Sequence, residues 1–136
     1  MNLKKNTGFT LIEVMIVVLI VGVLSSIAFS NYGDSVVNSR RTDARTAILN
    51  TATTLEKCVA IYGSYNNAGC SIGNGDSIDS PEKYYTVKVT AAARTFTLTA
   101  SAVGGKSQDR DTDCTSMTMD NLGAQSGSGA HPETCW

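Results

Sequence analysis

The sequence has few of the residues that metal centres and hydrolytic sites need. Its 136 residues include a single histidine, His131, and its four cysteines form no C-x-x-C pair. A tetrahedral zinc site would therefore need four scattered thiolates without the usual close spacing. If all the thiols are oxidised, only His131, in a loop rich in glycine and serine, could activate a nucleophile. We therefore expect no catalytic site, no cofactor and no zinc site.

The chain also lacks a basic excess and a phosphate-binding motif. Its formal charge is -1 at pH 7 and its sequence pI is about 5.7, which disfavours a general nucleic-acid binder. The only glycine pair of interest, "GNG", follows no predicted strand and lacks the third glycine of a dinucleotide fingerprint. Bases gather instead in "SRRTDAR". There, Arg40 and Arg41 could contact lipid head groups, DNA or acidic residues of a neighbouring subunit, and solvent exposure is the alternative.

Aspartates at alternate positions give one weak candidate for a cation site. Asp109, Asp111 and Asp113 have the spacing of a calcium loop, and Asp120 stands near the place of its last acidic ligand. Cys114, however, occupies the position of the sharp-turn glycine, and the flanking segments have the pattern of strands and not of helices. The segment is better interpreted as a solvated acidic loop.

Four cysteines, an even number in a small chain, favour two disulfides in an oxidising compartment, as expected of an exported protein. They allow three pairings. Pairing Cys58 with Cys70 and Cys114 with Cys135 gives the two shortest closures, and we expect these two bonds.

The apolar run near the N-terminus contains one charge, Glu13. A secretory signal peptide or a plain membrane anchor fits the length of the run, but neither explains a carboxylate that costs about 2.5–3.5 kcal/mol at the centre of a membrane segment. Cleavage between Gly8 and Phe9 would place a free ammonium one helical turn from Glu13. In a stack of such helices, the carboxylate of one could neutralise the ammonium of the next.

The stretch "GFTLIEVMIVVLIVGVLSSIAFSNY", preceded by "KK", resembles the type III signal and N-terminal helix of type IV prepilins. The resemblance implies cleavage after Gly8 by a prepilin peptidase, methylation of Phe9, and a role of Glu13 in assembly. Pilins of this type commonly carry a proline late in the apolar segment, where this chain has Ser30. The glycine that weakens the helix is present as Gly22.

The resemblance implies an α+β fold in which a long helix packs on a small antiparallel sheet. We expect a leader at 1–8, a membrane or filament-core helix at 9–30, its amphipathic continuation at 31–62, and a loop-plus-sheet head at 63–136. The continuation has apolar residues at helical spacing. Alternating patterns in "KYYTVKVTA", "RTFTLTASA" and "TSMTMD" predict strands, whereas residues 63–81 are dense in glycine, asparagine and serine and predict a loop.

The ending "CW", the segment "SRRTDA" and the cysteine-bounded C-terminal region resemble minor pilins of the PilE type. We expect a structural subunit of a type IV pilus, for adhesion, twitching motility or DNA uptake, first in the bacterial inner membrane and then in an extracellular filament. Its implied partners are other pilins, the inner-membrane assembly platform with its ATPase, and the prepilin peptidase. The alternatives are a type II secretion pseudopilin and a DNA-binding receptor pilin. The acidic C-terminal loops repel phosphates and so disfavour nucleic acid as a partner.

Overall fold

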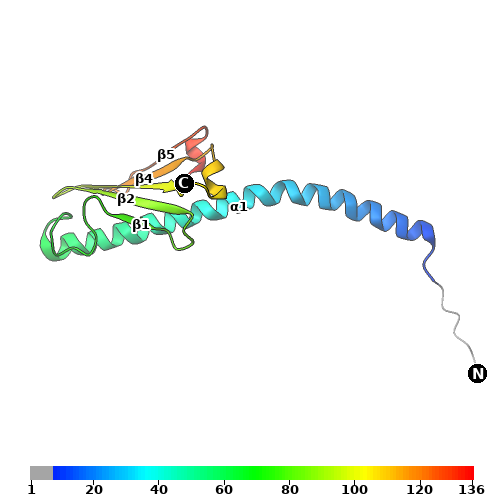
Figure 1. Cartoon of the computed structure of the whole chain (residues 1–136), viewed down its shortest axis with the longest axis horizontal. Helices are drawn as coiled ribbons and strands as arrows, with labels where there is room; N and C mark the ends of the chain where they lie inside the picture. Colours follow the sequence, from blue (N-terminus) through cyan, green and yellow to red (C-terminus); the bar gives the residue numbers. More distant parts are fainter. Residues whose placement is uncertain (1–7) are drawn as a thin grey trace, which may run out of the picture. The chain divides into compact units, whose positions relative to one another are not determined.

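A computed structural model describes residues 8–136, apart from the side chains of residues 28–31. Its first element is the helix α1, Leu11–Tyr62 (Figure 1). The prediction of one long helix ending near Tyr62 is confirmed, and its start lies two residues later than expected. The helix passes through Gly22 and Ser30 without a break, because no proline removes a backbone donor there.

The chain divides into an N-terminal segment that ends at Val36 and a head, Val37–Trp136. In the N-terminal segment the large apolar side chains of residues 9–27 are exposed, among them Phe9, which is 84% exposed. By length and composition this part of α1 is apolar enough to cross a bilayer, with a mean hydropathy of 2.7. Residues 1–7 of the predicted leader lie outside the described part of the chain.

The head contains a five-stranded sheet in the order β1-β2-β3-β4-β5, in which all neighbours are antiparallel. The strands are β1 (Ser77–Asp79), β2 (Tyr85–Ala91), β3 (Phe96–Ala102), β4 (Ser116–Asp120) and β5 (Gln125–Ser128). Two short 3-10 helices, η1 (Ser107–Arg110) and η2 (Pro132–Thr134), lie in the connection before β4 and near the C-terminus. This arrangement confirms the α+β fold expected from the sequence.

The core lies between one face of the sheet and the part of α1 that belongs to the head (Figure 1). Alternate residues of each central strand are buried, as the period of two requires. The helix contributes Ile48 and Leu55, both fully buried, from the predicted apolar stripe. The buried residues of the strands are Tyr85, Val87, Val89, Phe96, Leu98, Ala100, Met117 and Met119. The predicted cover of the sheet by the amphipathic helix is therefore confirmed.

Two edge strands were not expected from the sequence. Residues 63–81 were predicted to be a loop, but Ser77–Asp79 pair with β2 as β1. The second is β5, whose sequence "QSGS" carries no apolar alternation. Both strands are held by backbone pairing to a neighbouring strand and bury little side-chain surface. The hydrophobic pattern of the sequence therefore does not predict them.

Candidate assembly site

The first turn of α1 is closed by reciprocal hydrogen bonds between Thr10 and Glu13. The Glu13 N–H donates to Thr10 Oγ1 at 3.3 Å, and the Thr10 N–H donates to Glu13 Oε2 at 3.4 Å. This is a capping box, in which two backbone donors at a helix start find side-chain acceptors. It explains why the helix begins at Leu11, and the sequence "TLIE" carries the signal, although the prediction for Glu13 concerned its pairing with an ammonium and not helix capping.

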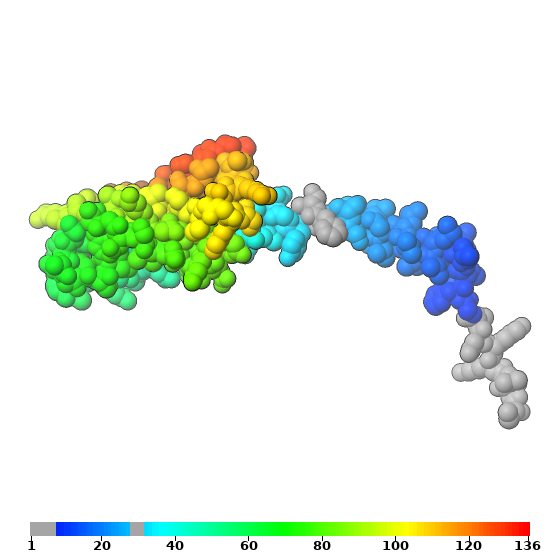
Figure 2. Space-filling view, in the orientation of Figure 1, coloured from blue at the N-terminus to red at the C-terminus, as the bar shows by residue number. Residues whose placement is uncertain are grey.

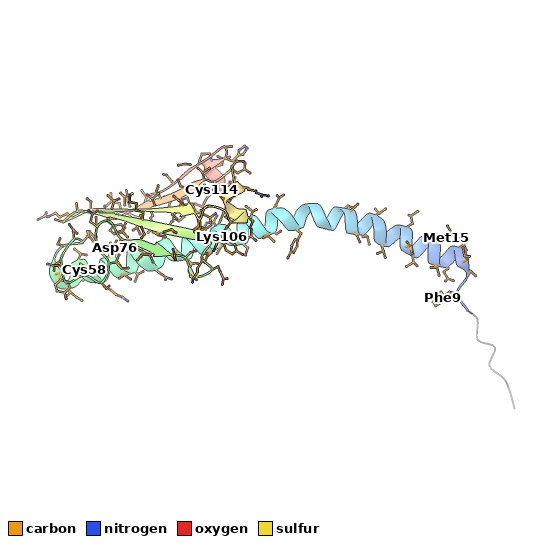
Figure 3. All side chains as sticks on the ribbon, viewed as in Figure 1. Phe9, Met15, Cys58, Asp76, Lys106 and Cys114 are labelled. Atoms are coloured by element: carbon orange, nitrogen blue, oxygen red, sulfur yellow. A yellow bond between two sulfur atoms is a disulfide. The ribbon has the colours of Figure 1, made fainter. Side chains whose placement is uncertain are left out.

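Glu13 lies beside an apolar hollow on the exposed surface of the N-terminal segment. The hollow has a volume of about 340 Å³ and is lined by Phe9, Glu13, Val14 and Val17. Gly8 and Phe9, the two residues of the expected cleavage site, are exposed. Figure 3 labels Phe9 at the beginning of this segment. The arrangement leaves a carboxylate and its apolar surroundings open to a partner of matching chemistry.

The four cysteines form the two expected disulfides. Cys58 is bonded to Cys70, with Cα atoms 5.5 Å apart, and Cys114 to Cys135, with Cα atoms 5.4 Å apart. The first bond fastens the loop after α1 to the end of the helix. The second joins the beginning of β4 to the C-terminus, and both of its cysteines are buried.

Arg41 of α1 forms a bidentate ion pair with Asp111, which follows η1. Arg41 Nε lies 2.8 Å from Asp111 Oδ2 and Arg41 Nη2 lies 2.7 Å from Oδ1. The side chains are only 9% and 4% exposed. The expectation that Arg41 is free for lipid or subunit contacts is therefore wrong, because this guanidinium is buried within its own head and already has a carboxylate partner.

Further hydrogen bonds surround the Asp111 carboxylate. Gln108 Nε2 donates to Asp111 Oδ2 and also to the hydroxyl of the buried Tyr85, both at 2.9 Å, and the Cys114 N–H donates to Asp111 Oδ1. Burial by itself would raise the pKa of the Asp111 carboxyl, but the hydrogen bonds from Arg41 and Cys114 outweigh burial and lower this pKa. The carboxylate is therefore ionised at neutral pH, and the solvated acidic loop predicted here is wrong for Asp111.

The basic segment of α1 also holds the C-terminus. Arg41 Nη1 donates to the carbonyl oxygen of Thr134 at 3.2 Å, and Arg45 Nε donates to the carbonyl oxygen of Cys135 at 3.0 Å. The indole of Trp136 donates to the Ser126 carbonyl of β5 at 2.7 Å. The uneven distribution of charge along the sequence thus corresponds to a tertiary contact, because the basic helix segment packs against the acidic C-terminal half.

Arg40 is directed differently from Arg41. Its guanidinium carbon lies 4.4 Å from the centre of the Tyr84 ring, and its Nη1 donates to Ser107 Oγ. Lys106 Nζ approaches the same ring at 5.5 Å and donates to the carbonyl oxygen of Lys83. Arg40 thus has partners within its own subunit, and it remains partly exposed.

The structure does not bring the four aspartates of the calcium candidate together. Asp111 faces Arg41, whereas Asp120 Oδ1 accepts the N–H groups of Leu122 and Ala124 in the turn after β4. Asp109 accepts the Gly105 N–H at 3.3 Å, and Asp113 is exposed. In the described part of the chain, no group of three or more acidic, histidine or cysteine side chains is placed to hold a metal ion.

Two glycines at the C-terminal disulfide were not singled out from the sequence. A Cβ on Gly127 would lie 2.5 Å from Cys135 Sγ and 2.7 Å from the carbonyl oxygen of Pro132. Gly129 has φ of 137° and its missing Cβ would collide with the backbone of Asp113. The C-terminal segment can pack directly on β5 because these positions carry no side chain. "SGSG" is composed of turn residues, but spacing alone does not indicate this contact.

Known proteins are similar to this chain both in its N-terminal motif and in its head. Residues 3–29 match the prokaryotic N-terminal methylation motif. A probable minor fimbrial protein of Dichelobacter nodosus is 41% identical over 73 residues, which are 54% of this chain and 42% of that protein. A fimbrial protein of Neisseria meningitidis is 30% identical over 100 residues, 73% of this chain and 59% of that protein. The chain spans less than half the length of the D. nodosus relative.

A solved structure of a type IV pilin from Shewanella oneidensis is similar at 27% identity and a TM-score of 0.46, covering 65% of this chain and 89% of that one. Residues 30–118, more than half of the chain, match the family described as type IV minor pilin ComP, DNA uptake sequence receptor. This match includes the basic helix segment, the first disulfide, the strands β1 to β3 and the first part of β4. The chain therefore belongs to the ComP family of type IV minor pilins.

Proposed function

We propose that this chain is a minor structural subunit of a type IV pilus and that it polymerises through its N-terminal helix. The observation that carries the proposal is the apolar run at residues 9–27, where exposed apolar side chains surround a single carboxylate, Glu13. A surface of this kind is stable in a bilayer or in the core of a helical assembly. In water this large apolar surface would stay exposed to solvent, which is unfavourable.

Processing supplies the partner for Glu13 in this proposal. A prepilin peptidase removes residues 1–8, residues 9–30 hold the precursor in the inner membrane, and the amine of Phe9 is methylated. Within one subunit, Glu13 closes the capping box with Thr10. In the filament, its carboxylate neutralises the Phe9 ammonium of the next subunit, in surroundings where an unpaired charge is costly. An assembly platform in the inner membrane moves the subunit between these two states.

Intact-mass analysis of sheared filaments tests this function. The expected species starts at Phe9, carries one methyl group on its amine, and contains two disulfides. A chain that starts at Met1, or one that never appears in the filament fraction while it is stable in the membrane, would contradict the proposal. Filaments from a deletion strain then distinguish a scarce subunit from a principal one, because only the loss of the principal subunit removes the body of the filament.

DNA reception is a second candidate function, favoured by the description of the family that residues 30–118 match. The sequence argument against it was the acidity of the C-terminal loops. Part of that acidity is compensated within the head, since Asp111 is paired with Arg41. The electrostatic repulsion of phosphates is therefore weaker than the residue count implies.

Fluorescence anisotropy of the full chain in detergent with short duplexes tests this second function. Binding that weakens steeply between about 50 and 200 mM salt would indicate contacts to phosphates, and a difference between duplex sequences would indicate a receptor. If no binding is seen at the lowest salt concentration, DNA reception is excluded as a function of this chain, and the proposed structural role is unaffected.

A further inference from the structure

Four basic residues lie on segments that meet at one end of the head. Arg40 comes from α1, Lys83 from the turn before β2, and Lys106 and Arg110 from the connection before β4. The contacts of Arg40 with Ser107 and of Lys106 with Lys83 join these three segments. We call the four residues the basal patch. Figure 3 shows Lys106 and Cys58 at opposite ends of the head. Arg40, near the beginning of the head at Val37, contacts Ser107 beside Lys106.

The basal patch is not neutralised within the head. None of its four cations forms an ion pair with a described residue. Arg40 and Lys106 both lie over the ring of Tyr84, at 4.4 and 5.5 Å from its centre, so two like charges are held near each other. The ring attracts each cation but does not remove the repulsion between them, whereas an anion bound beside them would.

A hollow of about 340 Å³ accompanies these cations. It is lined by Gly105, Lys106, Ser107, Asp109 and Arg110. Its one carboxylate, Asp109, is engaged by the Gly105 N–H at 3.3 Å. The nearby Glu82 is exposed and its N–H donates to the buried Asp43, so four cations stand against three acids. Figure 2 shows the segment around residues 100–110, in yellow, standing out on the surface of the head. An ammonium, a guanidinium and a hydroxyl are donors that suit a phosphate group.

The position of the patch in the chain indicates where the phosphate comes from. Arg40 follows Ser30, the last residue of the proposed membrane helix, by ten residues, which is at most about 15 Å along a helix. The head-group layer of a bilayer is itself about 5–7 Å thick on each side. Arg40 therefore comes within about one Debye length of that layer, where anionic lipids attract basic residues.

We propose that the basal patch binds the phosphate groups of anionic phospholipids in the membrane that holds the unassembled subunit. The contact orients the head on the bilayer before the subunit enters the filament. Entry into the filament withdraws the N-terminal segment from the bilayer and so releases the contact. The inference rests on the proposed membrane helix, and its test must therefore show separately that the chain is inserted.

The test uses the full chain in nanodiscs, with phosphatidylcholine alone or mixed with phosphatidylglycerol. Co-elution of chain and disc establishes insertion in both lipids, and its failure would count against the membrane helix and not against the patch. Hydrogen exchange is then followed at the amides of residues 104–110. These amides should exchange at least about fivefold more slowly in the anionic discs, and added salt should remove the difference.

A pair of double variants with the same change in charge gives the control. K106Q/R110Q should abolish the lipid-dependent protection, whereas K57Q/R94Q, at the opposite end of the head, should retain it. Unchanged exchange of the β2 and β3 amides shows that both variants are folded. Equal exchange in the two lipids, or equal loss in both variants, would overturn the proposal. So would a short DNA duplex that protects residues 104–110 in phosphatidylcholine discs while anionic lipid does not.

Discussion

Arg41 and Asp111 are seventy residues apart in the sequence, and their side chains form two parallel hydrogen bonds of 2.8 and 2.7 Å between α1 and the connection before β4. The pair lies inside the head, and Arg41 also reaches the carbonyl of Thr134 beside the C-terminal disulfide. One guanidinium therefore joins the helix to both sides of the C-terminal region. Removal of this guanidinium should therefore destabilise the C-terminal region more than the loss of any single apolar contact at the edge of that region.

Asp111→Asn should lower the free energy of unfolding of the head by about 3–5 kcal/mol, because it leaves Arg41 buried without a counter-charge. Urea unfolding followed by tryptophan fluorescence measures this change. Asp113→Asn, two residues away and exposed, is the matched control and should change stability by less than about 0.5 kcal/mol. Equal effects of the two substitutions would show that the ion pair contributes little.

Acid should weaken the head through the same carboxylate. Because the pKa of Asp111 is lowered in the folded state, its contribution to stability is complete above the ordinary value of 3.8 and is lost as the pH falls from there through the folded pKa. The thermal midpoint should therefore fall steeply in this acidic range and stay nearly level just above it. The Asp111→Asn variant should show a shallower decline, and an identical slope in both proteins would contradict the assignment.

Gly127→Ala should destabilise the C-terminal region, since its new methyl group would overlap Cys135 Sγ and the Pro132 carbonyl oxygen. We expect a loss of about 1–3 kcal/mol, typical of overpacking. Gly73→Ala, in open space on the loop before β1, should be close to neutral. Thermal unfolding of the two variants under non-reducing conditions provides the comparison, and a neutral Gly127→Ala would mean that the segment moves away freely.

The two disulfides should differ in their effect on stability. By the chain-entropy relation each closure contributes about 3 kcal/mol. Replacing Cys114 and Cys135 by alanine also empties a fully buried site, whereas Cys70 is only half buried. The Cys114/Cys135 double variant should therefore unfold at a lower urea concentration than the Cys58/Cys70 double variant. The reverse order would show that the loop after α1 contributes more than its burial indicates.

Glu13→Ala should be processed and accumulate in the membrane but enter filaments poorly, because it leaves the Phe9 ammonium of a neighbour unpaired at a cost of about 3–5 kcal/mol. Thr10→Val is the discriminating control. It removes the Oγ1 that accepts the Glu13 N–H and keeps the carboxylate. Near-normal amounts of Thr10→Val in sheared filaments would support docking. A defect as severe as that of Glu13→Ala would instead indicate that helix capping is the main task of Glu13.

Several features of this protein followed from the sequence because they depend on local order along the chain. The extent of α1 follows from an apolar run and a helical stripe without proline, and the faces of β2, β3 and β4 follow from strict alternation. The disulfides follow from the two shortest closures. The short motif around Gly8, Phe9 and Glu13 was likewise sufficient to indicate the family before any fold was known.

Only the tertiary structure decided which charges are free and which are buried. Arg40 and Arg41 are adjacent and of one type, yet one lies partly exposed over Tyr84 and the other is enclosed with Asp111. A rotation of about 100° between neighbouring helix positions sends them to different surroundings, and sequence pattern does not say what lies there. The edge strand β5 and the close packing of Cys135 on Gly127 have the same origin, because they depend on segments brought together only when the sheet closes on the helix.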